Sequence, residues 1–260
     1  MHHFINTLFA GFRGMNHVFT KMIAVFGCMM LVACSTESNF GDGTGTSTEV
    51  TTPDQVISVA AQGLFCSCAP TNESASSVFR DAGDIEYLDG ILVRVGWDSL
   101  EPAPGVYDWT LLDEQITKAE EQGLEISLAV LNGPKAPAWL ADEGAVMFEY
   151  FHRGEDKVLP VPWDPVYLER VAGFIHTLGQ RYNDNKVISL IHMTNATTNG
   201  FEMHYLVDST DEAEFVDLGY TERRMIDSWI TILDAYNQAF PEKLLDVEVH
   251  PIFRLSLIHI

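Results

Sequence analysis

The stretch that decides the fold is GILVRVGWDSLEPAPGVYDWTLLDEQITKAEEQGLEISLAVLNG, residues 90–133. It begins with an apolar run, 90–97, and ends with another, 124–133. The segment between them, 109–123, has its apolar residues on one face of a helix, and Gly123 suits the position just past a helix end. Two strands that are apolar on both faces and are joined through a helix are typical of a parallel sheet.

The same alternation continues along the chain. We predict further strands at 56–66, 186–194 and 244–253, and further helices at 164–184 and 221–241. Asp164 is the expected N-cap of the first of these helices, with Pro165 in its first turn, and Thr221 is the expected cap of the second. This order predicts an α/β fold, either a doubly wound sheet or part of a (β/α)8 TIM barrel.

Composition excludes several kinds of ligand. The formal net charge is −22 over 260 residues, so a nucleic-acid partner is not expected. No G-x-G-x-x-G follows a strand, and the nine histidines lack a spacing such as H-x-x-x-H, so we expect no nucleotide cofactor and no metal. Cys66 and Cys68 form a lone C-x-C with too few ligands for a metal, and we interpret both as small core residues.

The first 34 residues differ from the rest of the chain. Lys21 precedes a short apolar run that ends in Leu-Val-Ala-Cys at Cys34, which resembles the lipobox of bacterial lipoproteins. We predict a lipoprotein signal peptide at 1–34 with lipidation at Cys34, and a flexible linker at 35–53. The protein is then expected in the cell envelope, lipid-anchored, periplasmic or at the cell surface; the alternative is an ordinary signal peptide with a chance cysteine.

The motif that follows the 90–97 strand points to a family. The pattern W-x-x-x-E-P-x-x-G-x-Y-x-W, from Trp97 to Trp109, resembles clan A glycoside hydrolases, especially the β-galactosidase-like families 42 and 35. The block GLEISLAVLNGPKAPAWL at 123–140 is similar to their third strand and its following loop, and the resemblance covers roughly residues 85–253. It implies a (β/α)8 barrel, a carbohydrate substrate, no cofactor and a retaining mechanism.

Polar and aromatic residues gather just after the predicted strands, at the rim where barrel enzymes have their active sites. The resemblance implies a sugar subsite lined by Arg94, Trp97, Glu101, Asn132, Trp139, His192, Asn195 and His204. Trp97 and Trp139 have the flat faces that stack on sugar rings, and core or loop packing is the alternative for both. For Glu101 a structural role in the loop competes with a direct sugar contact, since Pro102 ends the strand there.

The pattern breaks at the residue expected to be the acid/base. Clan A enzymes use the Glu of an Asn-Glu pair after strand four, but here Ala196 follows Asn195. Glu202, six residues later, is our candidate acid/base, with His204 beside it. The alternative is a non-catalytic barrel that binds glycan at the cell surface.

The end of the chain carries a second departure. Residues 255–260, LSLIHI, are also the translation of CTG TCT CTT ATA CAC ATC, a transposase-type adapter end, so we interpret them as a sequencing artefact, with a natural apolar C-terminus as the alternative. We therefore expect a partial barrel at 54–254, truncated after about strand five, with the nucleophile beyond the chain end. As the N-terminal part of an exported, lipid-anchored glycoside hydrolase, this fragment is expected to be unstable and inactive by itself.

Overall fold

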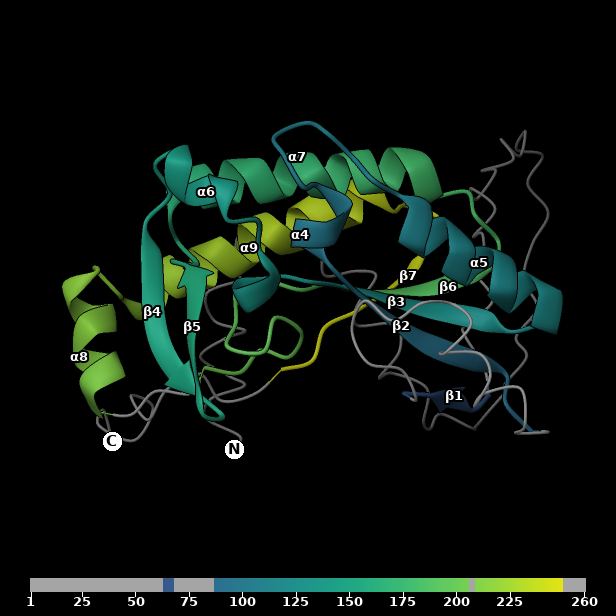
Figure 1. Ribbon diagram of the computed structural model, residues 1–260, viewed down its shortest axis with the longest axis horizontal. Coiled ribbons are helices and arrows are strands. Elements are labelled where there is room, and N and C mark those ends of the chain that lie inside the picture. The colour runs from purple at the N-terminus through teal and green to yellow at the C-terminus, as the bar shows by residue number, and fades with distance from the viewer. Residues whose placement is uncertain (1–62, 68–86, 206–208, 250–260) are drawn as a thin grey trace, which may run out of the picture. The chain divides into compact units, whose positions relative to one another are not determined.

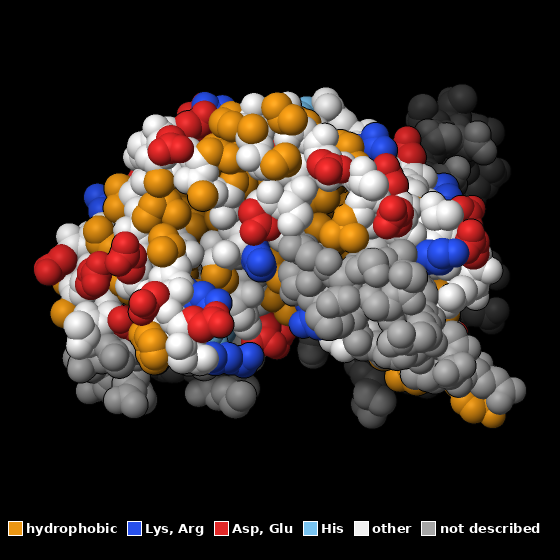
Figure 2. Space-filling model, viewed as in Figure 1, with side chains coloured by type: hydrophobic (Ala, Val, Ile, Leu, Met, Phe, Trp, Pro, Cys, Tyr) orange, Lys and Arg blue, Asp and Glu red, His pale blue; other side chains and the backbone are white. Residues whose placement is uncertain are grey.

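The computed structural model describes residues 63–67, 87–205 and 209–249, all within one compact unit, Ile57–Leu255. The predicted signal peptide at 1–34, the linker at 35–53 and the suspected artefact at 255–260 lie outside the described residues. Acidic side chains are spread over the visible face of the molecule (Figure 2), as the net charge of −22 requires.

The core of the fold is a parallel sheet of five strands in sequential order (Figure 1). The strands are β1 (Phe65–Cys66), β2 (Gly90–Gly96), β3 (Glu125–Leu131), β6 (Ile188–His192) and β7 (Leu244–Asp246), and they pair in the order β1-β2-β3-β6-β7. A doubly wound sheet reverses its strand order at a switch point, whereas a barrel wall does not. The sequential order therefore selects the barrel from the two predicted architectures, and the chain forms part of a (β/α)8 barrel.

Three long helices connect the strands and lie on one side of the sheet (Figure 1). They are α5 (Thr110–Gln122), α7 (Pro165–Tyr182) and α9 (Glu222–Ala239). Their predicted ends are confirmed: the Asp164 side chain accepts from the N–H of Tyr167 at 3.0 Å, and the Thr221 side chain accepts from the N–H of Arg224 at 3.1 Å. Gly123 ends α5 with φ 68, in the left-handed region.

A β-hairpin between β3 and α7 was not predicted from the sequence. Strands β4 (Met147–His152) and β5 (Glu155–Pro160) pair antiparallel through a two-residue turn, Arg153–Gly154. Both turn residues have positive φ, 53 and 85, as a type I′ turn requires. The alternation of buried Phe148 with exposed Glu149 is the period-two signal that would have identified β4.

Shorter helices complete the described chain. They are α4 (Trp97–Leu100), the 3-10 helix η1 (Gly133–Lys135), α6 (Trp139–Asp142) and α8 (Ser209–Asp217). Among the residues that the structure describes, no helix is both long enough and apolar enough to cross a membrane. Cys66 is disulfide-bonded, which corrects the interpretation of this residue as a reduced core cysteine; its partner lies outside the described residues.

Helices α7 and α9 approach each other closely at Gly179. A Cβ atom built on Gly179 would lie 2.3 Å from the carbonyl oxygen of Ala239 and 2.7 Å from its Cβ. Gly173 lies on the same helix, and a Cβ atom there would have no neighbour within 4 Å. Substituting alanine at Gly179 therefore tests the effect of close helix packing on stability. The same substitution at Gly173 tests the effect of helix propensity alone.

We expect Gly179→Ala to destabilise the protein by about 1–3 kcal/mol, because the added methyl group forces the two helices apart. Gly173→Ala is the control, and it should stabilise by about 0.5–1 kcal/mol because alanine favours the helix. Urea unfolding of the gene product expressed from the source DNA measures both effects. Equal effects of the two substitutions would show that α7 and α9 are not in contact at this point.

Candidate functional site

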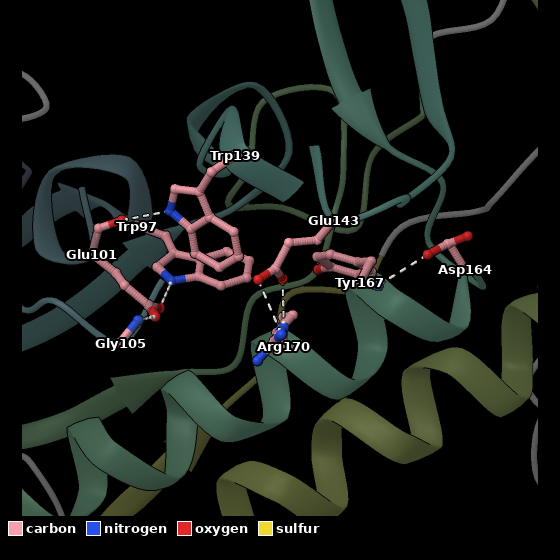
Figure 3. A network of polar contacts seen from close by, with 8 residues as sticks. All are labelled: Trp97, Glu101, Gly105, Trp139, Glu143, Asp164, Tyr167 and Arg170. Carbon is pink, nitrogen blue, oxygen red and sulfur yellow. Dashed lines mark hydrogen bonds and ion pairs between the residues drawn. The ribbon is translucent and has the colours of Figure 1, made fainter. Parts of the chain in front are cut away.

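The loop after β2 is organised by the buried carboxylate of Glu101, which is 5% exposed. Its Oε2 accepts a hydrogen bond from the indole N–H of Trp97 at 2.8 Å, and its Oε1 accepts one from the backbone N–H of Gly105 at 2.8 Å (Figure 3). Its backbone oxygen accepts from the indole N–H of Trp139 at 2.9 Å. Both carboxylate oxygens are therefore engaged in holding the loop, which is the structural alternative that the sequence left open.

Trp97 packs in the core rather than presenting a face to a ligand. Its side chain has no exposed surface, and its ring lies 5.3 Å from Phe174 and 5.9 Å from Trp139 between centroids. This burial contradicts the expected stacking of Trp97 on a sugar, because a sugar ring needs an open aromatic face. Trp139 is only half-buried and meets Trp97 edge-on at 84°, so its outer surface stays accessible.

Asn195 lies in a fixed position just after β6. Its Oδ1 accepts from the hydroxyl of Tyr167 at 2.9 Å and from the backbone N–H of Ala196 at 2.7 Å. Burial raises the pKa of Tyr167 well above its ordinary value, so the phenol keeps its proton and donates. Within the described part of the chain, the amide Nδ2 of Asn195 has no hydrogen-bond partner. Asn195 has no exposed surface, so a ligand oxygen can reach this donor only if the strand end opens.

Asn132 joins the end of β3 to the loop that follows β6. Its backbone N–H donates to the carbonyl of Gly200 at 3.0 Å, and its Nδ2 donates to the hydroxyl of Thr194 at 3.0 Å. The next residue, Gly133, has φ 61, and a Cβ atom there would lie 2.0 Å from the carbonyl oxygen of Thr197. The two strand ends therefore interlock closely enough that only glycine fits between them.

The loop after β6 contains Glu202 and His204, the two predicted residues that lie beyond Asn195. Asn199 closes a turn in this loop: its Nδ2 donates to the Glu202 carboxylate at 2.8 Å, and its Oδ1 accepts from the N–H of Glu202 at 3.0 Å. The carbonyl of His204 accepts from the hydroxyl of Thr198 at 2.7 Å. Glu202 is therefore oriented within its own loop by Asn199, a residue that the sequence reasoning did not single out.

His192 and Arg94 lie on the face of the sheet opposite the helices. Arg94 is in register with Ala129, Ala129 with His192, and His192 with Asp246, so the four residues form one layer. In a barrel this face lines the interior. His192 Nδ1 lies 3.0 Å from the Asp246 carboxylate, and this hydrogen bond lowers the pKa of Asp246. Ser127 contacts the other ring nitrogen of His192.

The candidate site is therefore formed by the carboxyl ends of β3 and β6. The structure brings together Asn132, Asn195 and the loop with Glu202 and His204, and it places Arg94 and His192 in the layer beneath. Trp97 and Glu101 belong to the supporting loop. Ser127 and Asp246 were missed by sequence reasoning, because their relation to His192 depends on strand register rather than on a local pattern.

A cavity of about 500 Å³ lies elsewhere, beside the N-terminus of α7 and against α9. Its lining includes Trp163, Asp164, Leu168 and Arg224, and it includes none of the predicted site residues. Two of its polar groups are already engaged, since Asp164 caps α7 and Arg224 donates to the carbonyl of Gly219. The predicted site residues therefore lie at the carboxyl ends of the strands and not around this cavity. Among the described ranges, no group of His, Cys, Asp or Glu has the arrangement of a metal site.

We expect Glu101→Ala to destabilise the protein by about 1–3 kcal/mol, because it leaves the buried indole N–H of Trp97 without an acceptor and removes the bond that holds the N–H of Gly105. Glu101→Gln keeps one acceptor oxygen and should cost less. Urea unfolding followed by tryptophan fluorescence measures the loss, with Glu114→Ala on the exposed side of α5 as the control. If Glu101→Ala unfolds at the same urea concentration as the control, the loop does not depend on this carboxylate.

Comparison with known proteins places this geometry in a family. The family model described as β-galactosidase, glycoside hydrolase family 42, matches residues 90–240. A β-galactosidase of an Arthrobacter species is 29% identical over 115 residues, or 38% of this chain and 15% of the relative. The β-galactosidase BbgII of Bifidobacterium bifidum is 27% identical over 158 residues, 57% of this chain and 21% of the relative.

Solved structures show a similar range of partial matches. Endo-glycoceramidase II from a Rhodococcus species matches at 19% identity and a TM-score of 0.44, over 67% of this chain and 44% of that chain. The β-galactosidase of the psychrophilic Marinomonas ef1 matches at 21% identity and a TM-score of 0.36, over 50% of this chain and 20% of that chain. The chain spans about a fifth or less of the length of the curated relatives. Because the family model matches more than half of the chain, this protein belongs to glycoside hydrolase family 42, the β-galactosidase family.

Proposed function

We propose that this chain supplies the first strands of the catalytic barrel of an enzyme that hydrolyses O-glycosidic bonds in oligosaccharides or polysaccharides. The observation that carries the proposal is the family match over residues 90–240, which contains Asn195 with its buried, unengaged amide donor. β-Galactosides are the first substrates to test, because the curated relatives are named β-galactosidases. No cofactor is needed for this chemistry.

The proposed mechanism is a retaining one with two carboxyl groups. Glu202, as the acid, gives its proton to the glycosidic oxygen while a second carboxylate attacks the anomeric carbon and forms a covalent glycosyl-enzyme. Glu202, now a carboxylate, takes a proton from water, and the resulting hydroxide displaces the enzyme carboxylate from the sugar. The described residues offer no assigned nucleophile, so the second carboxylate comes from another part of the protein.

The remaining predicted residues have supporting roles in this proposal. Trp139 offers its accessible ring surface to the sugar. Asn195 has no exposed surface, so its Nδ2 donates to a sugar hydroxyl only when the strand end opens on binding. In this proposal Arg94, on the inner face of β2, borders the nucleophile, and its positive charge favours the ionised carboxylate. Asn132 shapes the site through its bonds to Thr194 and Gly200, and His204 is near Glu202 in the same loop.

A second candidate function is a non-catalytic barrel that binds glycan. The observation that favours it is Ala196, which occupies the position of the family's acid/base and is fully buried. In that case Asn195 and Trp139 bind sugar without a proton donor. The two proposals differ in the role of Glu202, which is essential in the enzyme and dispensable in the binding protein.

We expect Glu202→Gln to lower kcat/KM for 2-nitrophenyl β-D-galactoside by roughly 10²–10⁴-fold in the gene product expressed from the source DNA, since the amide has no proton to give to the glycosidic oxygen. Glu149→Gln, on the exposed face of β4, is the matched control and should leave the rate unchanged. Unchanged turnover in the Glu202 variant would remove Glu202 as the acid/base. Galactoside binding that is retained by both variants, with no turnover in wild type, would support the glycan-binding alternative.

We also propose that Cys34 carries a lipid that anchors the protein in the cell envelope, at the periplasmic side of a membrane or at the cell surface. The support is the Leu-Val-Ala-Cys sequence after a basic residue and an apolar run. In cells fed radiolabelled palmitate, wild type should be labelled and found with membranes, and Cys34→Ser should lose both properties. Cys28→Ser, within the same apolar run, is the control and should keep both. Equal labelling of the two variants would show that Cys34 is not the lipidated residue.

A further inference from the structure

Three polar side chains form a continuous hydrogen-bonded chain across the inner face of the sheet. Ser127 comes from β3, His192 from β6 and Asp246 from β7, so each belongs to a different neighbouring strand. The Ser127 hydroxyl contacts His192 Nε2, and His192 Nδ1 lies 3.0 Å from the Asp246 Oδ2. Barrel interiors are mostly filled by branched apolar residues, so a polar chain at this level requires an explanation.

The atoms are connected as in a serine hydrolase triad, but the surroundings do not fit a nucleophile. Ser127 is 4% exposed and lies inside a strand that is paired with β2 on one side and β6 on the other. An acyl-transfer site needs an accessible hydroxyl and free N–H groups for an oxyanion, whereas the N–H groups of a central strand are used in the sheet. Ser127 therefore acts as a hydrogen-bonding partner of His192.

The His192 ring also contacts the loop that contains Glu202. It packs edge-on against Phe201, with 5.1 Å between ring centroids and 84° between the ring planes. Phe201 directly precedes Glu202, and its N–H donates to Asn199, the same residue that donates to the Glu202 carboxylate. The His192 ring is therefore in direct contact with the turn that orients Glu202.

We propose that Ser127, His192 and Asp246 form a positioning relay that fixes the His192 ring and, through Phe201, the placement of Glu202. An ionised carboxylate can only accept, so Asp246 selects the tautomer with the proton on Nδ1, and Nε2 then accepts the proton of the Ser127 hydroxyl. With both ring nitrogens bonded, the ring is held against rotation and flipping. This inference rests on the proposed function, in which Glu202 is the acid/base.

The tautomer can be measured without any enzymatic activity. In the gene product expressed from the source DNA and labelled with ¹⁵N-histidine, His192 should have its proton on Nδ1 and a bare Nε2 at neutral pH, with the signal assigned through its loss in His192→Asn. Asp246→Ala should remove this preference, and Ser127→Ala should retain it while shifting the Phe201 ring resonances. Ser189→Ala is the matched control, since it removes a serine hydroxyl from β6 that bonds the carbonyl of Ile126, and it should leave Phe201 unchanged. A proton on Nε2 in wild type, or Phe201 resonances that do not respond to Ser127→Ala, would overturn the relay.

Kinetics test the consequence for catalysis. With 2-nitrophenyl β-D-galactoside, Ser127→Ala and Asp246→Asn should lower kcat roughly 10- to 100-fold by misplacing the acid, with KM changed little. Ser189→Ala should keep both constants. If wild type turns over and the two relay variants match it, the positioning role is wrong even if the tautomer is as expected. If wild type shows no turnover, the proposed function fails, and the Phe201 resonances alone decide whether the relay holds the turn.

Discussion

The candidate site depends on the hydroxyl group of Thr194, which is fully buried between β3, β6 and α9. It donates to the carbonyl of Val130 at 2.5 Å and accepts from Asn132 Nδ2 at 3.0 Å and from the hydroxyl of Tyr236 at 3.1 Å. Burial raises the pKa of Tyr236, so the phenol has a proton to donate. One donor and two lone pairs are all that a hydroxyl possesses, and here all three are used. The residue that follows, Asn195, is therefore placed by a saturated buried network rather than by a flexible loop.

The motif that identifies the family is mainly a folding device in this protein. Trp97 is buried, Glu101 binds the N–H groups of the loop, and Trp109 stacks on Phe174 with 6.3 Å between ring centroids. The residues at fixed offsets after β2 thus join the strand end to α6 and α7. Their spacing is specific because the Trp97 indole has to reach the Glu101 carboxylate while the Trp97 and Trp109 rings both pack on Phe174, and that requirement is independent of the substrate.

Ala196 stands where the resemblance places the acid/base Glu, and its surroundings bear on both proposed functions. Ala196 is fully buried beside Asn195, so the family's usual acid/base position lies inside the packed strand end. The chain then turns at Asn199 and Gly200, and the next residues bring the partly exposed Glu202 into contact with Asn199. Tyr150 of the β4–β5 hairpin donates to the carbonyl of Thr198 at 2.6 Å, so the hairpin supports this loop from the outside. In the proposed enzyme, this braced loop supplies the carboxylate that the strand end lacks.

Much of the fold could be predicted from the sequence, because the signals that specify the helices lie in neighbouring residues. Apolar periodicity, the Asp164 and Thr221 caps and the Gly123 helix end specify α5, α7 and α9, because each of these signals acts within one turn of a helix. The hairpin was missed even though its Arg153–Gly154 turn and its alternating burial are also local signals. The two architectures left open by the alternation differ only in strand order, which no local pattern encodes.

The sequence by itself determined the helices, the apolar strands and the family motif, because these follow from neighbouring residues. Only the tertiary structure decided what the site residues contact. Glu101 turned from a candidate sugar ligand into a loop support, and Glu202 gained Asn199 as its partner. His192 lies 65 residues after Ser127 and 54 residues before Asp246 in the sequence. The three side chains meet solely through the register of three parallel strands. Side chains that are distant in sequence become neighbours through strand pairing, and pairing is a property of the whole sheet.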